Sequence, residues 1–299
     1  MELKQLQSFL RIADLGSFSK AGIALDIAQP ALSRQIRLLE VELGTALFVR
    51  HGRGVRLTER GRVLVDHARG IIYQCDRAAA VVRSPEQAVT GHIVVGLPPS
   101  LCRLLAVPLL TAGARQYPAL KIAIREGLSS YLLDWIAAGS LDCAVVYNAP
   151  AGKEFALTPM GMERRLVISS RRWEPLPAQV SVKRLAQLPL VLPARPHATR
   201  LMIDALLDKH GLKPTIVAEI DGISAILEMV KNNFGHAVLP RSALAASNTV
   251  KALIATPIAG DPINSRIAIA TAARRPDALA QRAVSELLVK LVAGVLREI

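Results

Sequence analysis

The most informative side chains of the chain lie between residues 29 and 37, where amide, hydroxyl and guanidinium groups recur at intervals of three and four. They are Gln29, Pro30, Ser33, Arg34 and Arg37. At this spacing the polar groups share one face of a helix. Such groups form hydrogen bonds with the edges of base pairs, and an arginine can bridge O6 and N7 of guanine. Proline is tolerated at the first helical position, so Pro30 indicates where this helix begins.

The neighbouring residues predict how this polar face is held. Leu32, Ile36 and Leu39 form an apolar stripe elsewhere on the same helix,. Residues 26–29 form a turn, and Ser17 is a good N-cap for a helix that precedes it,. The inward-facing residues of that earlier helix are Phe18, Ala21 and Leu25. This layout predicts a helix-turn-helix, whose second helix lies in the major groove of DNA. The alternative is an ordinary helical hairpin whose polar face meets only water.

The flanking segments predict a small domain that covers residues 1–57. An apolar stripe over residues 3–13 predicts a further helix, which completes a three-helix core,. Residues 47–57 are expected to form a two-stranded wing, with glycines at 52 and 54 in the turn,. The arginines that project from the wing are Arg50, Arg53 and Arg56. Arginine suits the narrow, electronegative minor groove of DNA, although a solvated basic loop would have the same composition.

A long helix is predicted from Thr58, which caps it, to about residue 84, and Pro85 ends it,. Apolar and small residues recur along it in steps of three and four over three heptads. This register is typical of a coiled coil, so we expect the helix to pair with its copy in a second chain. Residues 58–90 then form a dimerisation helix and hinge. The seam residues are Leu64, Ala68, Ile71, Cys75 and Val82.

From residue 91 the pattern changes to strands that alternate with helices through short loops, which predicts parallel strands with right-handed crossovers,. Two such units follow one another, and the chain crosses between them twice. We expect lobe I to comprise residues 91–161 and 265–299, and lobe II to comprise residues 162–264. The fold class is therefore α+β multi-domain, with the winged helix-turn-helix, the linker helix and a two-lobe α/β domain in that order.

The two-lobe domain predicts a ligand between the lobes, because open α/β sheets bind ligands beyond the carboxyl ends of their strands. Ser100 and Ser129 each follow a strand and open a helix, whose free N–H groups attract anions,. A polar loop in lobe II follows another strand, and its candidate residues are Arg195, Pro196, His197 and Thr199, with Arg200 as a further arginine that could bind a carboxylate. The expected ligand is a small organic anion. A simple helix-cap role for Ser100 stays open.

The first sixty residues resemble the LysR-type transcriptional regulators. The matching segments are SFSKAG, AQPALSRQIRLLE, LG, LFVR and LTERG, in the family's order and spacing. The resemblance implies a winged helix-turn-helix that binds double-stranded operator DNA, and a periplasmic-binding-protein-like effector domain. It implies a small-molecule co-inducer, and it places Ser100 at the family's effector-binding hydroxyl. It also implies a homodimer that assembles into a homotetramer, and it allows RNA polymerase as a further partner.

Composition is consistent with this interpretation. The net charge of +13 suits an anionic partner, although the basic excess is spread over the whole chain,. No GxSxG, HExxH or Walker pattern is present, so an enzyme is not expected, and neither is a metal or a cofactor besides the co-inducer,. A transported-solute binding protein would carry a secretion signal, and a DNA-coating protein would need no ligand domain. No signal peptide or membrane-spanning run is seen, which predicts a cytoplasmic protein,. Cys75, Cys102 and Cys143 are expected to be reduced, half-buried core residues rather than redox sensors.

Overall fold

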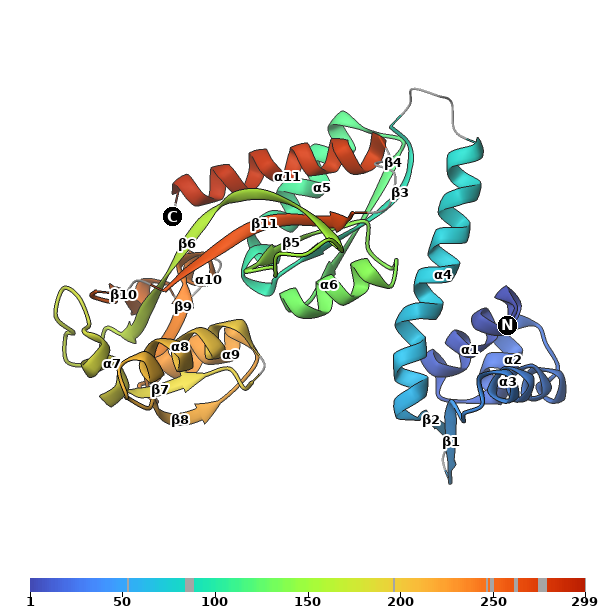
Figure 1. Cartoon of the computed structure of the whole chain (residues 1–299), viewed down its shortest axis with the longest axis horizontal. Coiled ribbons are helices and arrows are strands. Elements are labelled where there is room, and N and C mark those ends of the chain that lie inside the picture. The colour runs from blue at the N-terminus through green and yellow to red at the C-terminus, as the bar shows by residue number, and fades with distance from the viewer. Residues whose placement is uncertain are drawn as a thin grey trace.

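The computed structural model describes residues 1–52, 54–83, 89–195, 197–245, 247, 250–260, 263–273 and 279–298. Its N-terminal domain is built from three helices and a two-stranded wing (Figure 1). Their bounds are α1 Leu3–Leu15, α2 Phe18–Leu25, α3 Gln29–Leu43, β1 Phe48–His51 and β2 Gly54–Leu57. Leu6, Phe9 and Ile12 of α1 pack against Leu32 and Ile36 of α3 in one buried cluster. The predicted three-helix core and wing are confirmed.

The helix ends of this domain follow the local sequence. Ser17 caps α2 by accepting a hydrogen bond from the backbone N–H of Lys20 at 3.4 Å. Gly44 ends α3 with a φ of 66°, a conformation that glycine adopts without steric cost,. Gln29 was placed in the turn from sequence, whereas it is the first residue of α3 and Pro30 is the second. Both positions lie in the first turn, where the N–H that proline lacks has no helical partner.

The linker helix α4 runs over Glu59–Arg83, and Thr58 caps it by accepting a hydrogen bond from the N–H of Gly61 at 2.9 Å. Its first half packs on the N-terminal core of the same chain, where Ala68 is completely buried. Ala68 therefore has no surface left for a partner chain, which corrects its assignment to the dimer seam. Leu64 is half-buried against the same core. The remaining seam residues, Ile71, Cys75 and Val82, are exposed.

The second half of α4 lies against lobe I of its own chain. Gly70 permits this approach, because a Cβ at that position would lie 1.9 Å from the carbonyl oxygen of Ala138. Arg77 pairs with the buried carboxylate of Asp142 at 3.1 Å, and Tyr73 donates a hydrogen bond to the same carboxylate. The linker helix is therefore in contact with both the N-terminal domain and the effector domain.

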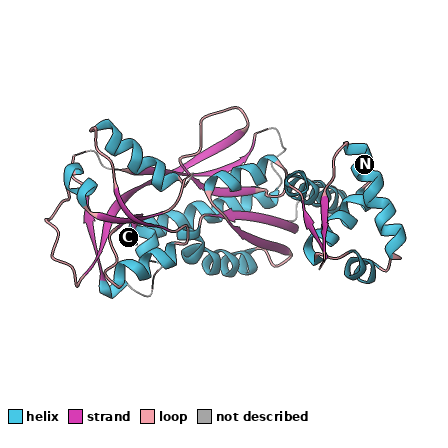
Figure 2. Ribbon diagram, turned by 90° about the horizontal axis from the view of Figure 1, so that it is seen from below, coloured by secondary structure: helices cyan, strands magenta, loops and turns pink. Residues whose placement is uncertain are grey.

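Lobe I is a sheet covered on both faces by helices (Figure 2). Its elements are β3 Gly91–Leu97, α5 Pro99–Gln116, β4 Leu120–Glu126, α6 Ser129–Ala137, β5 Cys143–Tyr147 and α11 Leu279–Glu298. The central strand β3 pairs in parallel with both β4 and β5, as the alternating pattern predicts. One face packs against α5 and α11, and the other packs against α6. These helices hold the carboxyl ends of β3 and β5 at the boundary with lobe II.

Two antiparallel strands, β6 Phe155–Ser170 and β11 Asn264–Ala272, carry the chain between the lobes. They join most of the strands into one sheet in the order β10-β6-β11-β5-β3-β4, with β9 also paired to β6. Lobe II adds the remaining elements: α7 Val182–Gln187, β7 Pro189–Leu192, α8 Ala198–Lys209, β8 Thr215–Glu219, α9 Ile223–Lys231, β9 Ala237–Pro240, α10 Arg241–Ala245, the 3-10 turn Val250–Ala252 and β10 Leu253–Pro257.

The topology of lobe II differs from the sequence prediction. Strands β7 and β8 are parallel as expected, but β9 and β10 both run antiparallel to β6. From sequence only residues 165–169 of β6 are predicted as a strand, because its first half contains Pro159 and Gly161, which interrupt the pattern of a buried strand,. The helices α7 and α10 are not predicted from sequence, because five or six residues are too few to show a helical period, and the strand β10 is not predicted either,.

Candidate functional sites

The polar face of α3 and the wing lie around one groove of about 550 Å³. The predicted residues that line it are Pro30, Ser33, Arg34, Arg37 and Arg50. Gln29 is exposed at the start of α3 and accepts a hydrogen bond from Ser19 at 2.9 Å. Arg53 lies outside the described residues. Five side chains chosen from sequence thus line a single surface, although they come from two elements.

The wing is tied to the recognition helix by Glu40, near the end of α3. Its carboxylate accepts hydrogen bonds from the N–H groups of Leu47 at 2.7 Å and Phe48 at 3.3 Å. The Arg50 guanidinium lies 5.8 Å from the centre of the Phe18 ring, which holds it beside the first turn of α2,. The groove therefore presents three guanidinium groups on a fixed frame, and such a surface can contact both phosphates and base edges.

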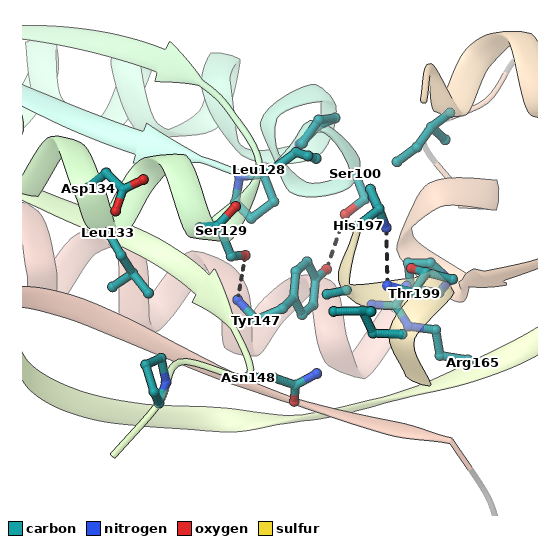
Figure 3. Close-up of a pocket in the computed structure, with 18 of the residues that line it drawn as sticks. Ser100, Leu128, Ser129, Leu133, Asp134, Tyr147, Asn148, Arg165, His197 and Thr199 are labelled. Carbon is teal, nitrogen blue, oxygen red and sulfur yellow. Dashed lines mark hydrogen bonds between the residues drawn. The ribbon is translucent and has the colours of Figure 1, made fainter. Parts of the chain in front are cut away.

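A second site is a cavity of about 430 Å³ between the two lobes (Figure 3). Four predicted residues line it, namely Ser100, Ser129, His197 and Thr199. Arg195 does not line it: its guanidinium is exposed and pairs with Asp204 at 2.6 Å. Pro196 lies outside the described residues. The structure thus brings the lobe I serines and part of the lobe II loop together, and removes Arg195 from the site.

The two serines are held by Tyr147, the last residue of β5. The hydroxyls of Ser100 and Tyr147 are 3.1 Å apart, and Ser129 accepts a hydrogen bond from the Tyr147 N–H at 2.9 Å (Figure 3). Ser100 makes no cap: the N-cap of α5 is Pro98, and no side chain caps that helix. The helix-cap alternative for Ser100 is therefore wrong. Its hydroxyl belongs to a buried network at the lobe boundary.

The same network crosses into lobe II through Glu163 of β6. Its carboxylate accepts hydrogen bonds from the Tyr147 hydroxyl at 2.9 Å and from the Ser242 N–H at 2.7 Å. Burial, together with the negative charge of Glu163, raises the pKa of Tyr147, so this phenol stays protonated at neutral pH,. Glu163 therefore accepts hydrogen bonds from both lobes and positions Tyr147, which lines the cavity.

Arg165 is the functional candidate that sequence analysis missed. Its side chain is only 3 % exposed, lines the cavity and lies 5.4 Å over the Tyr147 ring. One guanidinium nitrogen donates to Ser265 at 3.0 Å, whereas Nε has no partner among the described residues. Burial lowers its pKa, but a guanidinium remains charged in proteins at neutral pH,. The signal in the sequence was an arginine directly before the apolar run of residues 166–168, where a buried unpaired charge is costly,.

Thr199 and His197 complete the lobe II side. The Thr199 hydroxyl is completely buried and has no partner among the described residues. The Nδ1 atom of His197 accepts a hydrogen bond from the Thr199 N–H at 3.1 Å and so caps α8. Burial and the nearby charge of Arg165 lower the pKa of His197 to about 4, so the ring is neutral at pH 7,. Because Nδ1 accepts, the proton sits on Nε2. Together these residues can bind a group with hydrogen-bond acceptors and a negative charge.

The cysteines differ from one another more than expected. Cys75 is exposed, Cys102 is half-buried and Cys143 is buried. Burial raises the pKa of Cys102 to about 11, and Glu126 adds to the effect. A raised pKa lowers the thiolate fraction and hence the reactivity of that thiol. In the part of the chain that the structure describes, no three His, Cys, Asp or Glu side chains are grouped to hold a metal ion. No described helix is long and apolar enough to cross a membrane.

A helix-turn-helix domain followed by a two-lobe ligand-binding domain defines the class of ligand-responsive DNA-binding regulators, and comparison with known families agrees. The family described as "Bacterial regulatory helix-turn-helix protein, lysR family" matches residues 3–62, and "LysR substrate binding domain" matches residues 86–293. The chain belongs to the LysR family. It is a LysR-type DNA-binding transcriptional regulator with an effector-binding domain, and not an enzyme.

Individual relatives cover most of the chain. The nitrogen assimilation regulatory protein nac of Klebsiella aerogenes is 32% identical over 298 residues, which is 98% of this chain and 95% of that protein. The nac protein of Escherichia coli K12 is 33% identical and covers 81% of this chain and 79% of its own length. Among solved structures, the LysR family regulator CbnR superposes with a TM-score of 0.71 at 19% identity, covering 97% of this chain and 99% of that one. This last likeness confirms the fold.

Proposed function

We propose that this regulator responds to a small organic anion held between the two lobes. The observation that carries the proposal is the buried guanidinium of Arg165, which faces the cavity with an unpartnered Nε. The nearby Glu163 carboxylate attracts this guanidinium, but the buried Nε–H still lacks an acceptor, which is costly,. A carboxylate ligand that meets it would form a short, charge-assisted hydrogen bond. The unpartnered Thr199 hydroxyl beside it supplies a further donor.

The cavity couples the ligand to the arrangement of the lobes. Arg165 and Thr199 belong to lobe II, and Ser100 and Ser129 belong to lobe I. A ligand that contacts both sides binds the closed arrangement better than an open one, and that difference in affinity shifts the equilibrium. Since α4 contacts lobe I through Tyr73 and Arg77, the shift changes the position of the recognition helices.

The DNA-contacting residues that we propose are the α3 and wing set: Gln29, Pro30, Ser33, Arg34, Arg37, Arg50 and Arg53. We further propose that two chains pair along α4 through Ile71, Cys75 and Val82, with Leu64 at the edge, and that dimers assemble into a homotetramer. The support is the exposure of those side chains. Two half-sites bound by one dimer must match the spacing of its paired recognition helices. The domain limits given by the sequence, 1–57, 58–90, 91–161 with 265–299, and 162–264, are retained.

The test is thermal denaturation of the full-length chain with a panel of carboxylates: acetate, hexanoate, benzoate, adipate and 6-aminohexanoate. Binding to the native state raises its melting temperature. We expect at least one of these compounds to stabilise the wild type, and Arg165→Met to abolish that shift. Arg195→Met is the matched control, because it removes an exposed arginine from a neighbouring loop outside the cavity.

Thr199→Val provides a second, milder variant that removes only the unpartnered hydroxyl. It should reduce the shift without removing it. If the carboxylates stabilise the wild type and the Arg165→Met protein equally, or if none of them stabilises the wild type, the proposal of an anionic effector at this site is wrong.

A further inference from the structure

The charges that line the cavity are divided between its two ends. Arg165 and Asp134 lie on opposite sides of it (Figure 3). Arg165 is buried, whereas Asp134 and a second acidic lining residue, Glu154, are exposed. Among the described lining residues Arg165 carries the one permanent positive charge. We call the part of the lining around the buried Arg165 the inner end, and the exposed part that carries Asp134 and Glu154 the mouth.

The two carboxylates at the mouth are not neutralised by the protein. No described residue forms an ion pair or a side-chain hydrogen bond with Asp134 or Glu154. Asp134 projects from α6, which also supplies Ser129 to the cavity, and Glu154 directly precedes β6. They come from separate segments of lobe I, so the anionic mouth does not arise from one run of acidic sequence.

The wall of the cavity combines polar and apolar side chains. Ser129, Tyr147 and Asn148 lie between Asp134 and Arg165 (Figure 3), and Leu133, Ala137, Pro150 and Phe155 form an apolar part. Leu133 is 8 % exposed and belongs to the core under α6, so this part of the wall is fixed. A ligand that spans the cavity can therefore pack an apolar segment against this part of the wall, between its polar ends.

From this division of charge we infer that the effector is a zwitterion: a single carboxylate on Arg165 and Thr199, an apolar chain, and a cationic group at the Asp134–Glu154 mouth. The inference rests on the proposed function and goes beyond it by naming the second charge. A dicarboxylate of the same length would place its outer carboxylate beside two like charges, which is unfavourable. A ligand with an uncharged outer group gains no electrostatic attraction from Asp134 and Glu154. The mouth thus selects against dianions and in favour of amino acids that carry their amine far from the carboxylate.

The experiment compares ligands that differ only in the outer group. Alkanoates, α,ω-dicarboxylates and ω-amino acids of four to eight carbons are titrated into the full-length chain by isothermal calorimetry. At the best length, the ω-amino acid should bind about twofold to fivefold more tightly than the alkanoate for each acidic residue it meets, as expected for solvent-exposed ion pairs. The dicarboxylate should bind more weakly than the alkanoate.

Variants at the mouth sharpen the comparison, because Asp134 is exposed and its replacement leaves the core intact. Asp134→Asn should reduce the preference for the ω-amino acid, and Asp134→Lys should reverse it in favour of the dicarboxylate. Asp208→Lys is the matched control: it makes the same charge change on an exposed residue of α8 that does not line the cavity, and it should leave the preference unchanged.

The outcomes separate this inference from the proposed function. If carboxylates bind in an Arg165-dependent manner but dicarboxylates bind as well as ω-amino acids, the zwitterion inference is overturned and the anion proposal stands. The zwitterion inference is also overturned if binding depends on Arg165 but Asp134→Lys does not alter the preference for ω-amino acids over dicarboxylates. If no member of the three series binds in a way that Arg165→Met abolishes, both proposals fail.

Discussion

The DNA-binding surface and the interlobe cavity are assembled in opposite ways. The described residues of the first come from positions 29–50, and almost all of them lie on one short helix whose spacing already aligns them. The second draws on residues from 98 to 240 that meet only because β6 and β11 cross between the lobes. A site built along one helix can be predicted from periodicity, whereas a site built across strands requires the fold.

The largest effect is expected from a mutation in the hydrophobic core of the N-terminal domain, which should disable the DNA-binding surface and leave the effector domain folded. Phe9 is completely buried in the N-terminal cluster, and Phe9→Ala should cost that domain about 3–5 kcal/mol,. Operator binding in a mobility-shift titration should be lost. Both tryptophans of the chain, Trp135 and Trp173, lie in the effector domain, so unfolding monitored by tryptophan fluorescence should be unchanged.

The matched control is Val41→Ala, which shortens an exposed side chain on the same three-helix domain. It should leave both measurements near the wild-type values. A large change in the tryptophan-detected transition of the Phe9→Ala protein would show that α4 couples the two domains into one folding unit, and the contrast drawn above would fail.

The next effect concerns the cavity alone and depends on pH. The pKa of His197 is about 4 in the folded chain, against an ordinary value of about 6.5, so between these values the unfolded chain binds the additional proton,. Stability therefore falls as pH is lowered from 6.5 to 4. The contribution of this residue is at most about 3 kcal/mol.

His197→Asn isolates that contribution, because asparagine can keep the N-cap of α8 without titrating,. The variant should lose less stability than the wild type between pH 6.5 and pH 4, measured by urea denaturation at each pH. His236, whose pKa burial also lowers, is present in both proteins and cancels in the difference. If the free energy of unfolding depended on pH equally in the two proteins, His197 would be solvated and the prediction would be wrong.

The difference between a site on one helix and a site across strands explains which functional residues could be predicted from sequence. The residues of α3 repeat within two turns, so their shared face followed from the helical period alone. Ser100 and Ser129 were predicted because helix starts after parallel strands lie at one sheet edge. Arg165 was not, because its apolar neighbours predict a buried strand and say nothing of the cavity beside it. Arg195 was wrongly placed, because the sequence does not show that Asp204, nine residues further on, accepts hydrogen bonds from both Arg195 and Arg200.

Within the DNA-binding surface, we expect Arg34 to contact base edges and Arg50 to contact the DNA without base specificity. Arg34 is exposed on α3 inside the groove, where a guanidinium can bridge guanine O6 and N7,. Arg34→Ala should cost about 1–3 kcal/mol at a specific operator and relax the discrimination between bases there. Competition mobility shifts with operator variants measure both quantities. Arg172→Ala, which removes an exposed arginine from the effector domain, is the control for loss of charge.

The smallest effect is expected at Arg50, on the wing strand β1 and beside the Phe18 ring. Here the guanidinium is held at the edge of the groove and is suited to a phosphate or to the minor groove, where base identity matters little,. Arg50→Ala should therefore weaken binding by a similar factor on specific and unrelated DNA. The slope of log affinity against log salt should become less steep by about 0.9, the value for one phosphate contact. If Arg50→Ala instead changed the preferred bases and left the slope intact, wing and helix would share one recognition role, and the distinction between positioning and base-reading arginines would not hold.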